Sequence, residues 1–126
     1  MDPILYQDGP PGYRGPRVPP PRVTVGLPFL DAERTLADAI RSVFAQSLPD
    51  WQLLLLDDGS TDGSLALARR VRDPRVRVIS DGRHLGLAHR LNELAALAEA
   101  PLLARMDADD LMHPERLSRQ VAYLDA

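Results

Sequence analysis

Two short acidic segments carry the side chains of this chain that are best suited to chemistry. Asp57-Asp58-Gly59-Ser60 follows a run of four leucines, and Asp107-Ala108-Asp109-Asp110 follows a second apolar run. Carboxylates that lie close together repel one another and are costly to desolvate unless a cation lies between them. Mg²⁺ and Mn²⁺ take oxygen ligands of this kind and commonly complete their shell with the phosphates of a substrate. The two segments therefore predict a divalent-metal site for a phosphorylated ligand.

The spacing within the second segment favours Asp107 and Asp109 as the metal ligands. In an extended segment, residues two apart project the same way, so both carboxylates would face one ion. A D-x-D pair alone is a weak signal, and Asp110 could simply cap a turn. Asp57 to Ser60 could equally be a turn that caps a helix. The chain has neither a G-x-x-x-x-G-K nor a G-x-G-x-x-G segment, so a bound diphosphate would need the metal.

The elements that must position these segments alternate along the chain. Apolar, β-rich runs predict strands at residues 23–27, 53–56, 76–79 and 102–106. Apolar residues at helical spacing follow each strand and predict four helices. The expected inward-facing residues are Leu36, Ala39, Ile40, Val43 and Phe44 in the first helix; Leu65, Ala68 and Val71 in the second; Leu87, Leu91, Leu94, Ala95 and Ala98 in the third; and Leu117, Val121 and Leu124 in the last.

Residues at the helix boundaries indicate where these helices begin. Asp31 is placed to cap the first helix, Thr61 or Asp62 to open the second, and Pro114 to start the last. The resulting βαβαβαβα order imposes a mostly parallel sheet with helices on both faces, so we predict an α/β fold. Ligands bind such sheets at the carboxyl ends of the strands, where residues 28–31 would join both acidic segments.

Composition limits the other interpretations. The chain has 126 residues, which suits one domain, and it has no cysteine, which excludes disulfides and zinc–thiolate sites. Its net charge of −3 gives no basic field, so we expect no nucleic-acid partner. No apolar run approaches the roughly 20 residues of a membrane span, which favours a cytoplasmic location and leaves open a peripheral attachment to the membrane. Residues 1–21 hold seven prolines and three glycines and predict an extended or disordered arm before a domain over 22–126.

Over about residues 22–124 the chain resembles the family 2 glycosyltransferases that have the GT-A fold. Four segments carry the resemblance, in the family's order and spacing: Val23 to Leu30, Gln46 to Ser64, His84 to Asn92, and Ala104 to Gln120. The resemblance implies the Rossmann-like, nucleotide-sugar-binding half of a metal-dependent, inverting transferase. Such an enzyme moves a sugar from a nucleoside diphosphate, most often UDP, to an acceptor, which the sequence does not identify.

The resemblance also implies roles for individual residues. Asp58 would contact the base, and residues 28–30 would form one wall of the pocket that binds the base. Asp107 would lie near the ribose or the metal, and Asp109 would ligate the Mn²⁺ or Mg²⁺ that bridges the diphosphate. Arg83 would approach the phosphates. The donor-binding set implied in this way is Pro28, Phe29, Leu30, Glu33, Asp57, Asp58, Arg83 and Asp107.

The chain departs from the family pattern in two places, which leaves alternatives open. The family usually has an aromatic residue and then asparagine where this chain has Leu30 and Asp31, which would weaken stacking on the base. The family's catalytic base follows the D-x-D segment, so it is expected beyond Ala126 and no residue is assigned to it. The chain is then the donor-binding half of an active transferase or a nucleotide-sugar-binding module without turnover.

Two further expectations concern the enzyme class and the assembly. A phosphatase of the haloacid dehalogenase type also uses D-x-D after a strand. There the first aspartate belongs to the strand that opens the domain, whereas Asp107 follows the fourth strand, which disfavours this class. An open sheet edge at the fourth strand could also favour homo-oligomers.

Overall fold

The chain folds as one parallel sheet with helices on both faces. The computed structural model describes residues 20–125, so the predicted arm, apart from residues 20 and 21, lies outside the described residues. The elements are β1 (Val23–Phe29), α1 (Leu36–Phe44), β2 (Trp51–Asp57), α2 (Ser64–Arg69), β3 (Val76–Ile79), α3 (Leu87–Leu97), β4 (Leu102–Arg105) and α4 (Arg116–Asp125). The strand order is β3-β2-β1-β4, with every pair parallel. The predicted α/β fold is confirmed.

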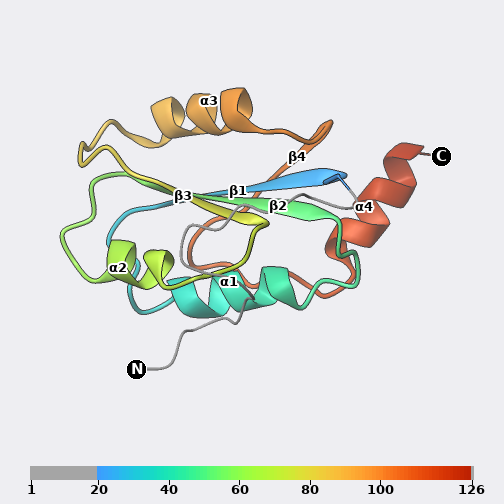
Figure 1. Ribbon diagram of the computed structural model, residues 1–126, viewed down its shortest axis with the longest axis horizontal. Coiled ribbons are helices and arrows are strands. Elements are labelled where there is room, and N and C mark those ends of the chain that lie inside the picture. The colour runs from blue at the N-terminus through green and yellow to red at the C-terminus, as the bar shows by residue number, and fades with distance from the viewer. Residues whose placement is uncertain (1–19, 126) are drawn as a thin grey trace.

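The leucine run in β2 supplies both faces of the sheet. Helix α3 covers one face, while α1 and α2 cover the other (Figure 1). Leu53 and Leu55 belong to the larger core cluster, which includes the apolar face of α1. Leu54 and Leu56 pack with Leu94 of α3. Because successive side chains of a strand point to opposite faces, an uninterrupted apolar run is what a strand covered on both sides requires.

Strand β1 is longer than predicted and runs through Pro28 to Phe29. The backbone oxygen of Gly26 accepts a hydrogen bond from Met106 on the β4 side, whereas the oxygen of Phe29 accepts one from Asp58 on the β2 side. Pro28 lies two residues after Gly26, so its backbone groups face the same neighbouring strand, β4. The N–H that proline lacks would therefore have been directed toward β4. Paired residues of β4 end at Arg105, opposite Gly26, so Pro28 lies just beyond the ladder between β1 and β4, where a missing donor is tolerated.

Three expectations about the helix ends are wrong. Helix α1 has Thr35 as its N-cap, and the Asp31 carboxylate instead accepts hydrogen bonds from the backbone nitrogens of Thr61 and Asp62. Helix α4 begins at Arg116, because Pro114 lies in the turn before it. Leu124 is 60% exposed rather than inward, since α4 buries only its earlier apolar residues.

Two further differences concern the second and third helices. Helix α2 begins at Ser64, with the Asp62 carboxylate accepting from the backbone nitrogen of Ser64. In α3, Leu94 is buried as expected, whereas Leu87 and Ala95, also expected to face inward, are exposed. Within residues 20–125 no helix has both the length and the apolar character needed to cross a membrane.

Candidate functional site

The carboxyl ends of three neighbouring strands bring the predicted site residues to one edge of the sheet. Phe29 at the end of β1 pairs with Asp57 at the end of β2, and the next backbone nitrogen, that of Asp58, donates to the oxygen of Phe29 at 2.9 Å. On the other side of β1, Met106 continues the ladder from β4 by one hydrogen bond to Gly26. The loops that begin at Leu30, Asp58 and Asp107 therefore leave adjacent strands in the same direction.

A pocket with a volume of about 280 Å³ opens at this edge beside β1 and α3. It is lined by Pro28, Phe29, Leu30, Asp58, His84, Gly86, Leu87 and Arg90. Half of this lining is in the donor-binding set expected from the sequence. Its exposed apolar rim consists of Leu30 and Leu87, whose exposed fractions are 43% and 49%. The pocket thus combines apolar walls with one buried carboxylate.

The Asp58 carboxylate is held by donors from the loop before α3 and from α3 itself. Its Oδ1 accepts from Arg90 Nε at 2.8 Å and from the backbone nitrogens of Leu85 and Gly86 at 2.9 and 3.3 Å. Its Oδ2 lies 3.0 Å from Nδ1 of His84. Burial raises the pKa of Asp58, but these hydrogen bonds, that from Arg90 foremost, outweigh burial and hold the pKa below its ordinary value. Asp58 is therefore an ionised acceptor in the pocket wall.

Arg90 is the cation that balances this carboxylate, and its side chain is fully buried. It also binds Asp81 from the loop after β3 and Glu93 one turn later on α3, at 2.8 and 2.7 Å. The hydrogen bond from Arg90 is the main reason that the pKa of Asp81 lies well below its usual range. Its bonds to the carboxylates, that to Asp81 first, raise the pKa of Arg90 against the opposing effect of burial. A buried charge of this kind is stable only when it is fully paired.

Four residues of the expected donor-binding set do not line the pocket. Glu33 accepts a hydrogen bond from the backbone nitrogen of Gly63, and Asp57 binds Ser60 and Ser80. The Arg83 side chain is 70% exposed beside Asp81, and Asp107 lies on the separate turn after β4. Glu33 and Asp57 thus have contacts that hold the loops of this edge together.

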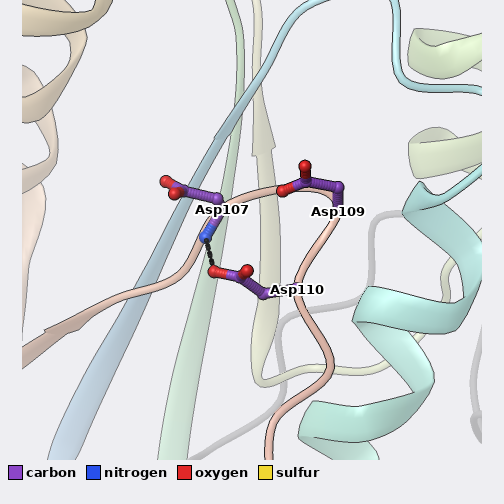
Figure 2. Close-up of side chains that lie close together, drawn as sticks. All are labelled: Asp107, Asp109 and Asp110. Carbon is purple, nitrogen blue, oxygen red and sulfur yellow. Dashed lines mark hydrogen bonds between the residues drawn. The ribbon is translucent and has the colours of Figure 1, made fainter.

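The second acidic segment forms a turn after β4 rather than an extended strand. The backbone nitrogen of Asp110 donates to the oxygen of Asp107, and Asp110 Oδ2 accepts from the nitrogen of Asp107, both at 3.1 Å. Figure 2 shows the three aspartates on one loop, with Asp110 turned back toward the Asp107 backbone. The expectation that extended backbone aligns Asp107 and Asp109 is therefore wrong, because a turn brings them together instead.

The acidic turn at Asp107–Asp110 nevertheless brings three carboxylates close enough to share one cation. Asp107, Asp109 and Asp110 each offer a carboxylate oxygen, and these oxygens lie within 4.8 Å of one another. One oxygen of Asp107 is paired with Arg105 at 3.1 Å, and one oxygen of Asp110 is used by the turn. The Asp109 carboxylate accepts no hydrogen bond from any of the described residues. Exposed carboxylates arranged in this way suit a hard divalent cation that keeps water or phosphate ligands.

A second cavity, of about 530 Å³, lies between the free edge of β4 and α4. Its walls include Leu103, Tyr123 and Leu124, which are exposed to solvent. The sequence predicts homo-oligomers at this open sheet edge, and assembly through it stays a prediction.

The sequence analysis did not identify Arg90 or the contact of His84 with Asp58. Arg90 lies three residues after Leu87 and four before Leu94, so it occupies an apolar-face position of α3. A charged residue at such a position is a signal, because it must be paired if it is buried. His84 is exposed, yet its ring contacts Asp58. No spacing in the sequence indicated that contact.

Comparisons with known proteins agree on one family. A sequence model described as glycosyl transferase family 2 matches residues 24–126. EpsE of Bacillus subtilis (strain 168), whose name assigns it to the glycosyltransferases, is 40% identical over 108 residues, which are 83% of this chain and 39% of EpsE. The chain thus spans about two-fifths of that relative's length.

Two solved structures share the fold over most of the chain. The structure of S. aureus TarS 1–349 in complex with UDP-GlcNAc has a TM-score of 0.78 at 23% identity, covering 82% of this chain and 31% of TarS 1–349. The mannosyltransferase PcManGT from Pyrobaculum calidifontis, in complex with GDP-Man and Mn²⁺, has a TM-score of 0.76 at 26% identity, covering 92% of this chain and 34% of PcManGT.

Proposed function

The chain belongs to glycosyl transferase family 2, and on that premise we propose that its pocket and acidic turn together bind a nucleoside-diphosphate sugar with a divalent cation. Membership of this family also sets aside the dehalogenase-type phosphatase. The observation that carries the proposal is the convergence of a base-sized pocket containing Asp58 with a carboxylate turn, at the carboxyl ends of adjacent strands. Open α/β sheets bind ligands in this position.

The pocket around Asp58 suits the base of the nucleotide. An ionised carboxylate in its wall accepts an N–H, and uracil and guanine both offer one on their pairing edge. Leu30 and Leu87 give apolar contact to the flat faces of the ring. We favour UDP as the nucleotide. This choice is supported by the structure of TarS 1–349, which shares the fold and is in complex with UDP-GlcNAc. Leu30 stands where the family usually has an aromatic residue, so aliphatic contact replaces stacking there, which predicts modest affinity for the base.

The acidic turn suits the diphosphate only through a cation. Asp107 and Asp109 would hold Mn²⁺ or Mg²⁺, because both offer carboxylate oxygens in one small region. Without a cation, the negative charges of a diphosphate and of this turn would repel one another. When bound, the ion supplies stabilisation of the charge that grows on the departing diphosphate. The Mn²⁺ in the structure of PcManGT with GDP-Man supports this choice of ion.

The reaction that this arrangement serves is sugar transfer with inversion. An acceptor oxygen forms a bond to the anomeric carbon while the bond from that carbon to the diphosphate oxygen breaks. The base that takes the acceptor proton is not assigned to a described residue. The described part of the chain would hold the donor, fix its base through Asp58 and orient its diphosphate through the acidic turn.

Calorimetric titration of UDP, GDP and dTDP into the chain, with and without Mn²⁺, tests this function. We expect one nucleotide to bind, and only when the metal is present. Release of the sugar would be followed separately, with UDP-GlcNAc as the donor, because binding and turnover need not occur together. Equal binding with and without metal would contradict the role of the acidic turn. Absence of nucleotide binding under all conditions would contradict the proposed function.

A further inference from the structure

We propose that Arg90 is a positioning residue of the nucleotide site, which fixes Asp58 so that only its Oδ2 oxygen is offered to the bound base. This inference rests on the proposed function, because it assigns a role within the same pocket. Arg90 would not touch the nucleotide itself. It would act through Asp58, the one carboxylate in the pocket wall.

The two oxygens of Asp58 are not equivalent. Oδ1 accepts from Arg90 Nε, from the nitrogen of Leu85 and, at 3.3 Å, from that of Gly86, so its acceptor sites are full. Oδ2 has only a 3.3 Å contact with the same Gly86 nitrogen and a contact with the exposed ring of His84. The Gly86 nitrogen is shared between both oxygens. Oδ2 is therefore the less occupied oxygen and the one at which a base N–H can be accepted, in place of the exposed His84 ring.

Arg90 has no donor left for a ligand. A guanidinium carries five N–H groups in a fixed fork, and each of the five has an acceptor here. Nε donates to Asp58; Nη1 donates to Asp81 Oδ2 and Glu93; Nη2 donates to Asp81 Oδ1 and to the backbone oxygen of Arg83. The outer edge of the fork is thus anchored on α3 and on the loop after β3. The remaining Nε–H points at Asp58 and cannot move without breaking this set.

The arrangement predicts that a positive charge at position 90 is not by itself enough to fix the orientation of the Asp58 carboxylate. A lysine at this position would keep one cation among Asp58, Asp81 and Glu93, but its single ammonium cannot reproduce the planar fork. The Asp58 carboxylate would stay ionised yet lose its fixed orientation. Arg90→Lys is therefore a variant that keeps the buried charge balance and removes the positioning.

The test measures UDP affinity in the presence of Mn²⁺ for the unaltered chain and four variants: Arg90→Lys, Arg75→Lys, Asp58→Asn, and the double variant Asp58→Asn with Arg90→Lys. We expect Arg90→Lys to weaken UDP binding roughly tenfold, which is the effect of losing one well-placed hydrogen bond to a charged group. Arg75→Lys is the matched control, because Arg75 stacks on Trp51 and pairs with Asp73 at the opposite end of the strands. It should lower the melting temperature while leaving UDP affinity unchanged.

The double variant separates positioning from a general loosening of the fold. If Arg90 acts only through Asp58, Asp58→Asn with Arg90→Lys binds UDP no more weakly than Asp58→Asn alone. A further loss in the double variant, or unchanged affinity in Arg90→Lys, would overturn the inference. If Arg90→Lys does not fold, Asp81→Asn serves instead, because it weakens the contacts that hold the Arg90 guanidinium. Asp81→Asn must then weaken UDP binding in the unaltered background but not in the Asp58→Asn background. Failure of the unaltered chain to bind UDP would instead contradict the proposed function itself.

Discussion

The side-chain oxygen of Gln46 accepts a hydrogen bond from the backbone nitrogen of Leu117 at 3.1 Å and so joins the end of α1 to the start of α4. Its amide nitrogen donates to the backbone oxygen of His113 at 2.7 Å, in the loop that follows the acidic turn. Gln46 is only 7% exposed, so water cannot readily replace it. One buried amide therefore ties the segment after Asp107–Asp110 to the helix layer.

Truncation of this amide should destabilise the fold. Gln46→Ala leaves the partner groups on residues 113 and 117 without their hydrogen bonds, and we expect a loss of roughly 2 to 3 kcal/mol. Gln120→Ala, on the exposed side of α4, is the matched control and should change stability by less than about 0.5 kcal/mol. Urea unfolding of both variants checks this. Equal stabilities would show that Gln46 does not anchor the loop.

Removal of one carboxylate from the acidic turn should abolish metal dependence without harming the fold. Asp109→Asn keeps the shape of the side chain but removes the charge, and we expect Mn²⁺-dependent UDP affinity to fall at least about tenfold. The melting temperature should stay unchanged, because Asp109 is exposed. Asp38→Asn, an exposed carboxylate on α1, serves as the control for calorimetry. Wild-type affinity in Asp109→Asn would remove Asp109 from the metal site.

A methyl group at Gly59 should disturb the loop that Arg90 binds. Gly59 has a φ of +89°, and a Cβ there would lie 2.9 Å from the carbonyl carbon of Arg83. Gly82 also has a positive φ, of +74°, but a Cβ there would meet nothing within 4 Å. Gly82→Ala should cost about 1 to 2 kcal/mol, from backbone strain alone. Gly59→Ala should cost roughly 2 to 5 kcal/mol, since the collision adds to that strain. Equal losses in the two variants would contradict the predicted contact.

Stability should fall in acid because of the carboxylates around Arg90. The pKa values of Asp58 and Asp81 are lowered in the folded chain, so between the folded and unfolded values the unfolded chain binds more protons. The stabilisation is complete above the unfolded value of about 4 and is lost as the pH falls toward the folded values. Melting temperatures measured from pH 7 to pH 3 should therefore drop below about pH 4. Asp81→Asn should show a shallower drop, and an unchanged profile would contradict this role for Asp81.

The sequence was sufficient to predict the fold because its local signals agree with the tertiary structure. The leucine run predicted a strand covered on both faces, and β2 is buried along its whole length. The ends of elements were less predictable, because they depend on distant partners. The sequence predicted Asp31 as a cap for α1, but its carboxylate accepts from the nitrogens of Thr61 and Asp62 instead. The approach of the loop before α2 cannot be read from residues near Asp31.

The candidate site was predictable in outline but not in its charge pairing. Acidic segments after two strands were enough to predict that their residues lie together at the carboxyl ends of neighbouring strands. The partner of Asp58, however, lies 32 residues away on α3, and only the packing of α3 against the sheet brings Arg90 to it. The turn at Asp107 was missed for a related reason, because its geometry depends on the Asp110 carboxylate folding back onto the backbone.

The most direct test of the account asks whether the pocket and the acidic turn form one nucleotide site. Amide NMR spectra of the chain would be recorded with UDP and Mg²⁺, and then with traces of Mn²⁺. We predict chemical-shift changes at Leu85 and Gly86, whose amides bind Asp58, and selective broadening by Mn²⁺ at residues 107–110. Changes confined to the cavity between β4 and α4, or no broadening at the acidic turn, would contradict the account.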